Sequence, residues 1–342
     1  MPHYKKIAIG LCITGVDTYW AMALATLISL KENIDITPVR ILVATDQDEK
    51  FDVFKQLEKS FGSEFVRVAP RAFYKDLVPK MKGNYATYWK FDLFNALYQD
   101  EALMYIDVDA FAVAKFSVHN IIDVFNEGIF HLAAVPAQRP VLERVAALRL
   151  RSPFDYFNAG VLFGVKDDRY EFAGIKSAYE AIVKFDTLGV YWHDQDIFNY
   201  LFRDDALKLP YVYNVHTGYL SINFRFPALV NGVASSDIDQ NVKIVHASGD
   251  FLFSWKYHPY KRKYAELVDS AMRMLDQAEE LDRDKWHPFR GALVILGQRA
   301  TSLSIDYYLQ CAGLRNKTFA SHFYNQRIKM ALRKTLRFFK AR

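Results

Sequence analysis

The first part of the chain alternates short apolar runs with longer segments of helical spacing. The apolar runs Lys6–Ile13, Pro38–Thr45 and Phe65–Val68 are typical of buried strands. Between them, Tyr19–Leu30 is apolar nearly all round and Glu49–Phe61 carries apolar residues at helical spacing, so two helices are predicted. This β-α-β-α-β order predicts a parallel sheet with helices on both faces.

Later parts of the chain repeat the same two patterns. The run Leu103–Ile106 follows a predicted helix over Asn84–Leu97, and this order places the run near the middle of the sheet. The remaining patterns predict strands over Phe157–Val165 and Lys243–His246, and helices over Tyr170–Phe185, His193–Phe202 and Pro259–Glu280.

Two carboxylates one residue apart follow the run Leu103–Ile106. In extended backbone, residues two apart point to the same side, so Asp107 and Asp109 are expected to converge where the strand leaves the core. Hard cations such as Mg²⁺ and Mn²⁺ prefer oxygen ligands and are often held by carboxylates together with substrate phosphates. The pair is therefore a candidate metal–diphosphate site at the carboxyl end of a strand. Because Asp is also common in turns, a plain strand-to-loop exit is the alternative.

Two further polar positions have both a structural and a functional interpretation. Asp194 and Asp196 lie in the first turn of the predicted helix His193–Phe202, where acidic residues suit the helix dipole, and capping is the simplest account of Asp194. His246 ends the strand Lys243–His246, and an isolated histidine in that position is more often structural than a ligand.

Composition excludes several classes of protein. The chain has 342 residues, of which 51% are hydrophobic and 24% charged, so it can bury a large core and is not a disordered chain. Its two cysteines, Cys12 and Cys311, provide no disulfide framework and favour a reducing compartment. No stretch reaches the roughly 18 apolar residues of a membrane-spanning helix, and the N-terminus lacks a signal-peptide pattern. These features predict a cytoplasmic protein.

Positive charge is concentrated at the C-terminal end. The net charge is +5, yet Tyr307–Arg342 contains nine Lys or Arg residues and no acid. Within His322–Arg342, apolar residues recur four apart from Tyr324 to Leu336, which predicts a basic amphipathic helix that lies on an anionic membrane. A helix packed on the domain with a solvated basic face is the alternative, and no motif points to nucleic acid. The predicted membrane-binding residues are Arg327, Lys329, Arg333, Lys334, Arg337 and Lys340.

A series of short blocks supports a more specific interpretation. In chain order they are Asp17-Thr-Tyr19, Asp107-Val108-Asp109, Asn158-Ala159-Gly160, Asp194-Gln195-Asp196 and His246-x-x-Gly249. From about Lys6 to Trp255 the chain thereby resembles the family 8 glycosyltransferases. These are retaining enzymes of the GT-A fold that include glycogenin and bacterial lipopolysaccharide galactosyl- and glucosyltransferases.

The resemblance implies how a UDP-sugar donor would bind. The Tyr19 ring would stack on uracil, with the backbone of Ile13 and Thr14 near the base. The Asp-x-Asp motif with its central Val108 would contact the donor, and Lys90 stands where the family carries a donor-binding Arg or Lys. The implied ligands of Mn²⁺, with Mg²⁺ as the alternative cation, are Asp107, Asp109 and His246; the Gly249 amide would approach the phosphate.

The resemblance also assigns the sugar end of the site. Asn158 and Ala159 would lie beside the donor sugar, Asp194 would hydrogen-bond it, and Gln195 would lie near the anomeric carbon. The bound cation would neutralise charge on the departing UDP. Since Gln195 is a poor nucleophile, the favoured route is front-face attack through an ion-pair-like state in which Asp194 and Gln195 orient the sugar.

Three stretches depart from the family pattern. After His246 the family has Gly-x-x-Lys-Pro-Trp, whereas Leu252 occupies the lysine position here and Lys256 is the candidate replacement. An Asp that grips sugar hydroxyls in the galactosyltransferases is missing from Val135–Arg139, where Gln138 could take its role. The loop Cys12–Val16 lacks the paired acidic residues of bacterial members.

Together these observations predict a GT-A fold, that is, a mixed, mostly parallel sheet flanked by helices, with a basic helical C-terminal extension. A catalytic domain over residues 1–260 is expected, with a nucleotide-sugar half to about 115 and an acceptor half beyond, followed by a helical region over 261–342. The predicted activity is transfer of glucose, galactose or N-acetylhexosamine from a UDP-sugar to a saccharide or glycolipid hydroxyl, forming an α linkage. A peripheral position on the inner face of the membrane is expected.

Two other functions are compatible with parts of the sequence. A phosphotransferase could use Asp107 as a nucleophile, although such enzymes carry their Asp-x-Asp motif near the start of the fold. A non-catalytic sugar-nucleotide-binding protein would account for the missing Lys-Pro-Trp motif but not for the intact acidic motifs.

Overall fold

A seven-stranded sheet in the order β3-β2-β1-β4-β7-β6-β8 forms the centre of the fold. The computed structural model describes residues 4–74, 85–137, 142–185, 193–216, 241–247, 258–278 and 281–301. The strands of the sheet are β1 (Lys6–Cys12), β2 (Arg40–Ala44), β3 (Glu64–Val68), β4 (Glu101–Ile106), β6 (Leu132–Pro136), β7 (Phe157–Val165) and β8 (Ala206–Lys208).

The sheet is mixed but mostly parallel, as predicted. Strands β3, β2, β1 and β4 run parallel to one another, and β6 runs parallel to β8. Strand β7 is antiparallel to both β4 and β6. The predicted central position of the strand before Asp107 is confirmed, because β4 is the fourth strand of the seven.

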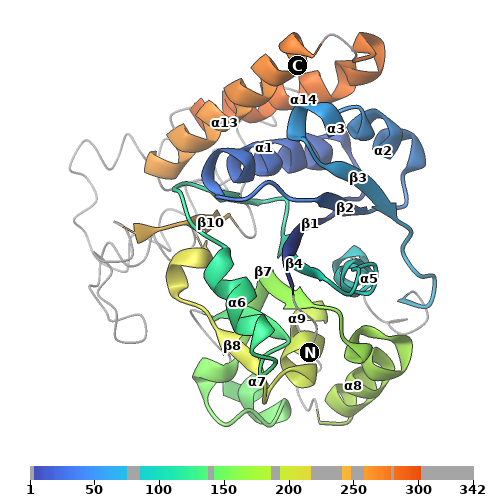
Figure 1. Cartoon of the computed structure of the whole chain (residues 1–342), viewed down its shortest axis with the longest axis vertical. Helices are drawn as coiled ribbons and strands as arrows, with labels where there is room; N and C mark the ends of the chain where they lie inside the picture. The colour runs from blue at the N-terminus through green and yellow to red at the C-terminus, as the bar shows by residue number, and fades with distance from the viewer. Residues whose placement is uncertain are drawn as a thin grey trace, which may run out of the picture. The chain divides into compact units, whose positions relative to one another are not determined.

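Alternation along the strands divides the core between the two faces of the sheet. Ile7, Ile9 and Leu11 of β1 belong to one cluster of buried side chains, and Ala8 belongs to the other. Helices α1 (Asp17–Asn33), α13 (His258–Gln277) and α14 (Arg283–Thr301) cover the first face, while α5 (Trp89–Asn95), α8 (Phe172–Phe185) and α9 (His193–Leu201) cover the second (Figure 1).

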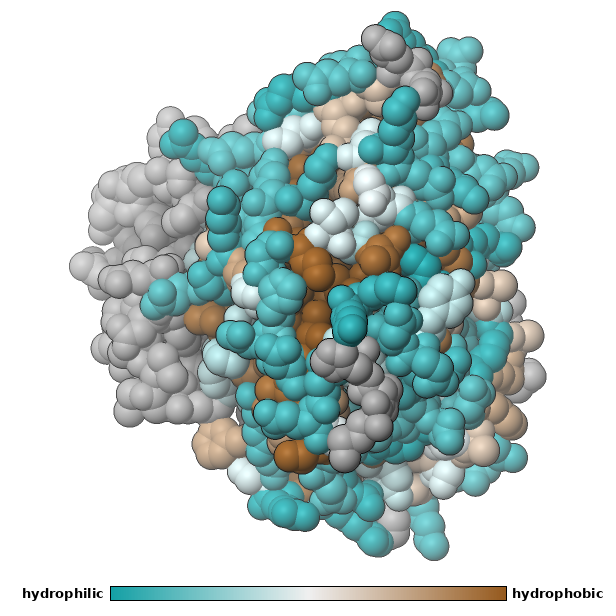
Figure 2. All heavy atoms as spheres, in the orientation of Figure 1, coloured by the Kyte–Doolittle hydropathy of each residue, from teal (hydrophilic) through white to brown (hydrophobic). Residues whose placement is uncertain are grey.

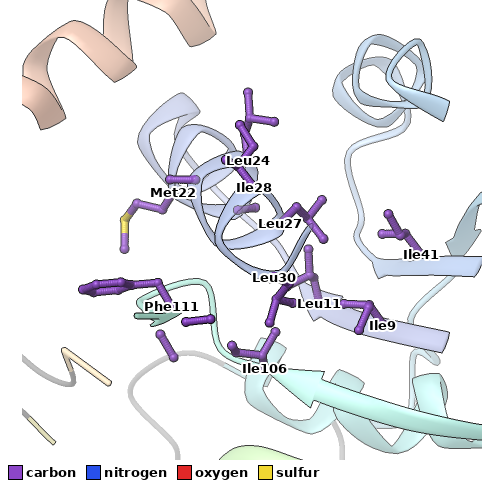
Figure 3. Close-up of a cluster of buried hydrophobic side chains, with 14 of the residues drawn as sticks. Ile9, Leu11, Met22, Leu24, Leu27, Ile28, Leu30, Ile41, Ile106 and Phe111 are labelled. Atoms are coloured by element: carbon purple, nitrogen blue, oxygen red, sulfur yellow. The ribbon is translucent and has the colours of Figure 1, made fainter. Parts of the chain in front are cut away.

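Helix α1 packs directly on the middle of the sheet. Figure 3 shows Leu27 and Leu30 of α1 next to Leu11 of β1, with Ile106 of β4 close by. All four side chains are essentially buried, which explains why this helix is apolar nearly all round. Hydrophobic side chains on the face shown in Figure 2 gather near its centre and are surrounded by hydrophilic ones.

Short elements connect these layers. They are the helices α2 (Asp48–Lys55), α3 (Glu58–Phe61), α6 (His119–Asn126) and α7 (Leu142–Ala147), the 3₁₀ turns η1 (Tyr85–Tyr88), η2 (Pro153–Asp155), η3 (Asp168–Tyr170) and η4 (Tyr211–Tyr213), and a small sheet of β5 (Ala110–Ala112), β10 (Ile244–His246) and β9 (Val215–His216). Among the residues described, no helix has both the length and the apolar character required to cross a bilayer.

Two predicted helices are divided differently in the structure. The single helix expected over Glu49–Phe61 is two helices, and the break lies at Gln56, whose side-chain oxygen accepts hydrogen bonds from Asp282 N and Trp286 Nε1. The second helix ends at Phe61 and is capped by Gly62, which adopts the left-handed φ of 66° that glycine tolerates best. The helix predicted over Asn84–Leu97 is also divided: the 3₁₀ turn η1 comes first, and α5 follows it directly.

Helices α13 and α14 share the core of α1. Tyr264, Leu267 and Leu293 are buried in the same cluster as α1, and the Phe289 ring lies edge-on to Trp20 at 6.2 Å. The predicted domain boundary near residue 260 stays a prediction, and the expected basic helix over 322–342 lies outside the described residues.

A cluster of ion pairs connects the start of β6 to the end of β7. Asp167 follows β7 and accepts hydrogen bonds from Arg169 Nη2 at 2.7 Å and from His131, which precedes β6. Burial alone would raise the pKa of Asp167, but the hydrogen bonds from Arg169 and His131 outweigh it and lower the pKa to about 2.

An Asp167→Asn variant is therefore expected to lower the free energy of unfolding by about 2 kcal/mol at pH 7. Because the folded pKa is depressed, this contribution is complete above the unfolded pKa of about 3.9 and disappears as the pH falls towards about 2. Urea denaturation at pH 7 and pH 3 measures both values. Asp204→Asn, which removes an exposed ion pair with Arg151, is the control and should change stability little. A gap between wild type and Asp167→Asn that widened in acid would contradict this assignment.

Candidate active site

The two acidic residues of the Asp-x-Asp motif lie in a tight turn between β4 and β5. Strand β4 ends at Ile106, and the Ala110 N–H donates to the Asp107 carbonyl at 2.9 Å. The expectation that Asp107 and Asp109 converge through alternation in an extended strand is therefore wrong in its geometry. The carboxylates are brought together instead by this turn at the carboxyl end of β4.

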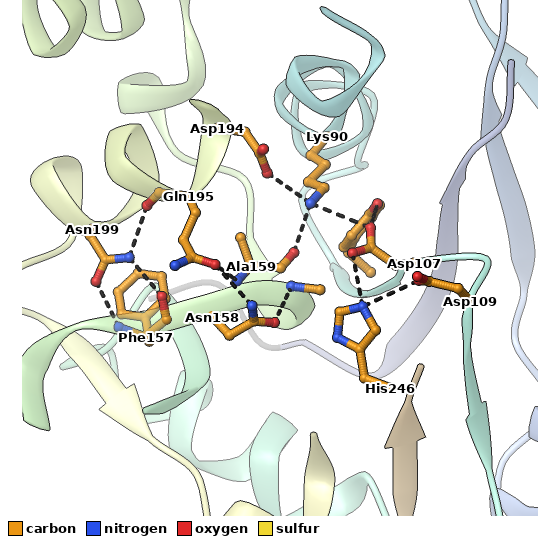
Figure 4. A network of polar contacts seen from close by, with 12 residues as sticks. Lys90, Asp107, Asp109, Phe157, Asn158, Ala159, Asp194, Gln195, Asn199 and His246 are labelled. Carbon is orange, nitrogen blue, oxygen red and sulfur yellow. Dashed lines mark hydrogen bonds and ion pairs between the residues drawn. The ribbon is translucent and has the colours of Figure 1, made fainter. Parts of the chain in front are cut away.

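A histidine from a distant part of the sequence completes this acidic pair. Strand β10 runs antiparallel to β5 and places His246 opposite Ala110, and the Ala247 N–H donates to the Asp109 carbonyl at 2.9 Å. His246 Nε2 consequently lies 3.2 Å from Asp109 Oδ1 and 3.6 Å from Asp107 Oδ2 (Figure 4).

These three side chains fit a divalent cation. One ligand atom from each of Asp107, Asp109 and His246 lies within 4.8 Å of the others. Carboxylates and imidazole are both common ligands of divalent cations, and the Asp107 and Asp109 side chains are 29% and 24% exposed, so further ligands can reach a bound cation. The histidine expected to be structural or a ligand thus lies where a ligand is needed.

Asp109 and His246 shift each other's pKa. Burial would lower the pKa of His246, but the Asp109 carboxylate outweighs burial and raises it. Burial would raise the pKa of Asp109, and the facing His246 reverses this and lowers it. Each group therefore stabilises the charged form of the other.

Lys90 of α5 connects the triad to helix α9. Its Nζ lies 2.7 Å from Asp194 Oδ2 and 3.4 Å from Asp107 Oδ1, and it donates to the Ala159 carbonyl at 2.9 Å. Burial would lower the pKa of this lysine, but Asp107 and Asp194 outweigh burial and raise it, so Lys90 is charged. Asp194 thus contacts a cation, in addition to lying in the first turn of α9.

A network of amides surrounds the predicted sugar-binding residues. Asn158 Nδ2 donates to Gln195 Oε1 at 2.9 Å, and the Ala159 N–H approaches the same oxygen at 3.3 Å. Gln195 Nε2 donates to the Tyr156 hydroxyl at 2.8 Å. The structure therefore brings Asn158, Ala159 and Gln195 together with Lys90 and the acidic turn (Figure 4).

The predicted base-binding residues lie at the carboxyl end of β1. Tyr19 is 44% exposed in the first turn of α1, so its ring is accessible to a ligand. Gly15, with a left-handed φ of 81°, accepts hydrogen bonds through its carbonyl from Gln47 at 2.9 Å and Lys50 at 3.0 Å. Thr14 follows Ile13 in this loop; Ile13 itself is buried, and its N–H donates to the Ala44 carbonyl at 3.0 Å.

Sequence patterns missed several members of the site. Tyr105 donates its hydroxyl to Asp107, Asn214 bonds both Asn158 and His246, and the His216 ring lies 4.5 Å from that of His246. Tyr105 lies two residues before Asp107, and this spacing in a strand could have identified it as a neighbour of the acidic motif. Asn214 and His216 carry no comparable signal, because only the pairing of β9 with β10 places them here.

Some predicted residues cannot be placed. Gly249, Lys256 and Gln138 lie outside the described residues, as do the six basic residues predicted to bind a membrane. Val108, between the two motif aspartates, packs its side chain against the core, and its carbonyl accepts from Thr26 Oγ1 at 3.0 Å.

Gly160 leaves space that the triad needs. A Cβ atom at this position would lie 2.1 Å from His246 Cε1 and 2.9 Å from Asn158 Oδ1. Because His246 is buried, a Gly160→Ala variant is expected to displace the ring, weaken Mn²⁺ binding and destabilise the protein by about 1–3 kcal/mol.

The measurements for Gly160→Ala are Mn²⁺ titration and thermal unfolding. Gly291→Ala is a matched control on the exposed side of α14, where an added Cβ meets nothing within 4 Å, and it should be neutral or slightly stabilising. Unchanged Mn²⁺ affinity in Gly160→Ala would show that the ring position does not matter for the cation.

One protein family matches the chain over most of its length. The model of the family "Glycosyl transferase family 8" matches residues 11–257. The chain belongs to glycosyl transferase family 8. The match covers almost the same stretch as the predicted resemblance, and it includes every element that contributes to the acidic turn, Lys90 and the amide network.

Solved structures share the fold. An active-site mutant of LgtC is 17% identical with a TM-score of 0.58, over 77% of this chain and 95% of that one. Galactosyltransferase LgtC in complex with donor and acceptor sugar analogues is also 17% identical, with a TM-score of 0.57 over 83% of this chain and 99% of that one. The glycosyltransferase GlyE of Streptococcus pneumoniae is 17% identical, with a TM-score of 0.52 over 80% of this chain and 63% of its own. No curated protein sequence matches the chain.

The GT-A fold predicted from the sequence is therefore confirmed, and the chain is a family 8 glycosyltransferase with a candidate divalent-metal site at Asp107, Asp109 and His246.

Proposed function

We propose that this glycosyltransferase moves a hexose from a UDP-sugar to a hydroxyl group of a saccharide or glycolipid with retention of configuration. The observation that carries the proposal is the direct contact between the two halves of the site. Lys90 bridges Asp107 of the candidate metal site and Asp194 next to Gln195, so a diphosphate and its attached sugar can be bound side by side.

Different side chains of the protein would bind the diphosphate and the uracil of the donor. Asp107, Asp109 and His246 would hold Mn²⁺, which when bound supplies positive charge to the diphosphate. Lys90 adds a fixed, buried positive charge on the same side. Tyr19 offers an exposed ring on which uracil can stack.

Asp194, Gln195 and Asn158 would orient the sugar. In the proposed reaction the bond between the anomeric carbon and the UDP oxygen breaks, and a bond from the acceptor oxygen to the same carbon forms on the same face. The acceptor proton passes to an oxygen of the departing diphosphate, so the protein needs no separate base. Gln195, held by Asn158 and Tyr156, stabilises the sugar without bonding to it covalently.

A donor panel tests this proposal. The protein is incubated with Mn²⁺ and UDP-glucose, UDP-galactose or UDP-N-acetylglucosamine, and release of UDP is measured with and without saccharide acceptors. Mn²⁺-dependent release and an α-linked product are expected. Hydrolysis of simple monophosphates without UDP release would favour a phosphotransferase, and binding without turnover across plausible acceptors would favour a non-catalytic protein.

We also propose that the enzyme acts in the cytoplasm at the inner face of a membrane, on a lipid-linked acceptor such as a lipopolysaccharide precursor. The support is the acid-free segment Tyr307–Arg342, with its nine basic residues and four-residue apolar repeat. Deletion of residues 322–342 is expected to abolish sedimentation with anionic liposomes, and equal sedimentation of both forms would refute membrane binding.

A further inference from the structure

A continuous line of hydrogen bonds joins the candidate metal site to Gln195, and Asn214 stands at its centre. This residue lies between η4 and β9 and is only 1% exposed. Its Oδ1 atom is 3.0 Å from His246 Nδ1, and its Nδ2 atom is 2.7 Å from Asn158 Oδ1. Asn214 therefore touches one residue of each half of the site.

The direction of every bond in this line follows from one backbone group. The Gly160 N–H can only donate, and it donates to Asn158 Oδ1 at 2.8 Å. This fixes the orientation of the Asn158 amide, whose Nδ2 then faces Gln195 Oε1. Because Asn158 Oδ1 is an acceptor, Asn214 must approach it with Nδ2, and Asn214 Oδ1 is left facing His246.

The same logic determines which nitrogen of His246 is available to a cation. A carbonyl oxygen cannot donate, so His246 Nδ1 must carry the hydrogen that binds Asn214 Oδ1. The lone pair of the neutral ring is then on Nε2, the atom that faces Asp107 and Asp109. Outer groups of this kind orient the ligands of many metal sites.

At the Gln195 end of this line, the orientation of the side-chain amide is fixed in the same way. Gln195 Oε1 accepts from Asn158, so its Nε2 faces the Tyr156 hydroxyl, which in turn donates to Asp196 Oδ1 at 2.9 Å. Each amide between His246 and Asp196 thus has one orientation that satisfies its partners. A reversed amide at any point would set two acceptors or two donors against each other in a buried place.

We propose that Asn214 is a positioning residue with two separable roles: its Oδ1 presents His246 Nε2 to the cation, and its Nδ2 holds Asn158, and through it Gln195, for the donor sugar. The inference rests on the proposed function, since it assumes that the triad binds a cation and that Gln195 meets the sugar.

Two substitutions of Asn214 separate the roles. Asn214→Leu keeps the approximate size and removes both hydrogen bonds, so Mn²⁺ affinity, measured with the metal alone by electron paramagnetic resonance, should fall about 10- to 100-fold. Asn214→Asp retains an acceptor for His246 Nδ1 but cannot donate to Asn158. Its Mn²⁺ affinity should be unchanged or higher, while Mn²⁺-dependent turnover of the UDP-sugar should fall about tenfold or more.

Asn33→Leu is a matched control. This asparagine is also buried and hydrogen-bonded, but at the far end of α1 from Tyr19, so its loss should affect stability without changing Mn²⁺ affinity. Thermal unfolding of all variants, and circular dichroism, establish that each is folded under the assay conditions.

Three outcomes overturn the inference. They are wild-type Mn²⁺ affinity in folded Asn214→Leu, an equal loss of Mn²⁺ affinity in Asn214→Asp and Asn214→Leu, and full turnover by Asn214→Asp. Failure of the proposed function has a different signature, because wild-type protein would then bind no Mn²⁺ or release no UDP.

Discussion

An Asp109→Asn variant is expected to lose Mn²⁺-dependent UDP binding while remaining folded. The substitution preserves size and removes the charge of the carboxylate whose Oδ1 lies 3.2 Å from His246 Nε2. Loss of an outer-shell partner alone costs about 10- to 100-fold in metal affinity, so loss of a direct ligand should cost at least about 100-fold. Asp109 is 24% exposed and packs at the end of a turn, which leaves the core intact.

Calorimetric titration of UDP with and without Mn²⁺ measures the effect of Asp109→Asn. Asp123→Asn, an exposed aspartate of α6, carries the same change of charge away from the triad and should bind UDP like wild type. Tight Mn²⁺-dependent UDP binding by Asp109→Asn would remove the basis for assigning the cation to this turn.

A Lys90→Met variant is expected to lose both stability and activity. The lysine side chain is 5% exposed, and its Nζ is the cation shared by Asp107 and Asp194. Methionine fills a similar volume but leaves the buried Asp194 without this partner. Removing one member of a buried ion pair costs about 3–5 kcal/mol, so unfolding in urea should occur at markedly lower denaturant concentration.

A second variant tests the cause of this loss. In Lys90→Met combined with Asp194→Asn, both buried charges are removed together, and part of the lost stability should return. Transfer activity should stay low, because the positive charge beside the diphosphate is still missing. If Lys90→Met were as stable as wild type, or the double variant less stable than either single one, the bridging role of Lys90 would be wrong.

Much of the fold was predictable because its determinants are local. The apolar run of β1, the all-round apolar helix α1 and the nine residues of β7 are set by side-chain periodicity, and the predicted limits of β7 are those observed. The break at Gln56 was not predictable in this way. At this break the Gln56 side chain accepts a hydrogen bond from Trp286, more than two hundred residues further along the chain, and no local pattern signals that contact.

Some features of the candidate site could likewise be recognised in the sequence, and others only in the structure. The Asp-x-Asp motif, the Asp-Gln-Asp block and Lys90 could be recognised in the sequence, because each is a short block of residue types in a fixed order. That Lys90 bridges Asp107 and Asp194 was not visible, since the contact requires α5 and α9 to pack on the same face of the sheet.

The sequence by itself therefore determined the family, many of the main strands and helices and most residues of the candidate site, since periodicity and short motifs are properties of neighbouring residues. Only the tertiary structure decided that a turn, and not an extended strand, brings Asp107 and Asp109 together, and that Asn214 connects His246 to Asn158. The reason is physical: strand β10 pairs with both β5 and β9, and this pairing alone brings His246 to the acidic turn and Asn214 to His246.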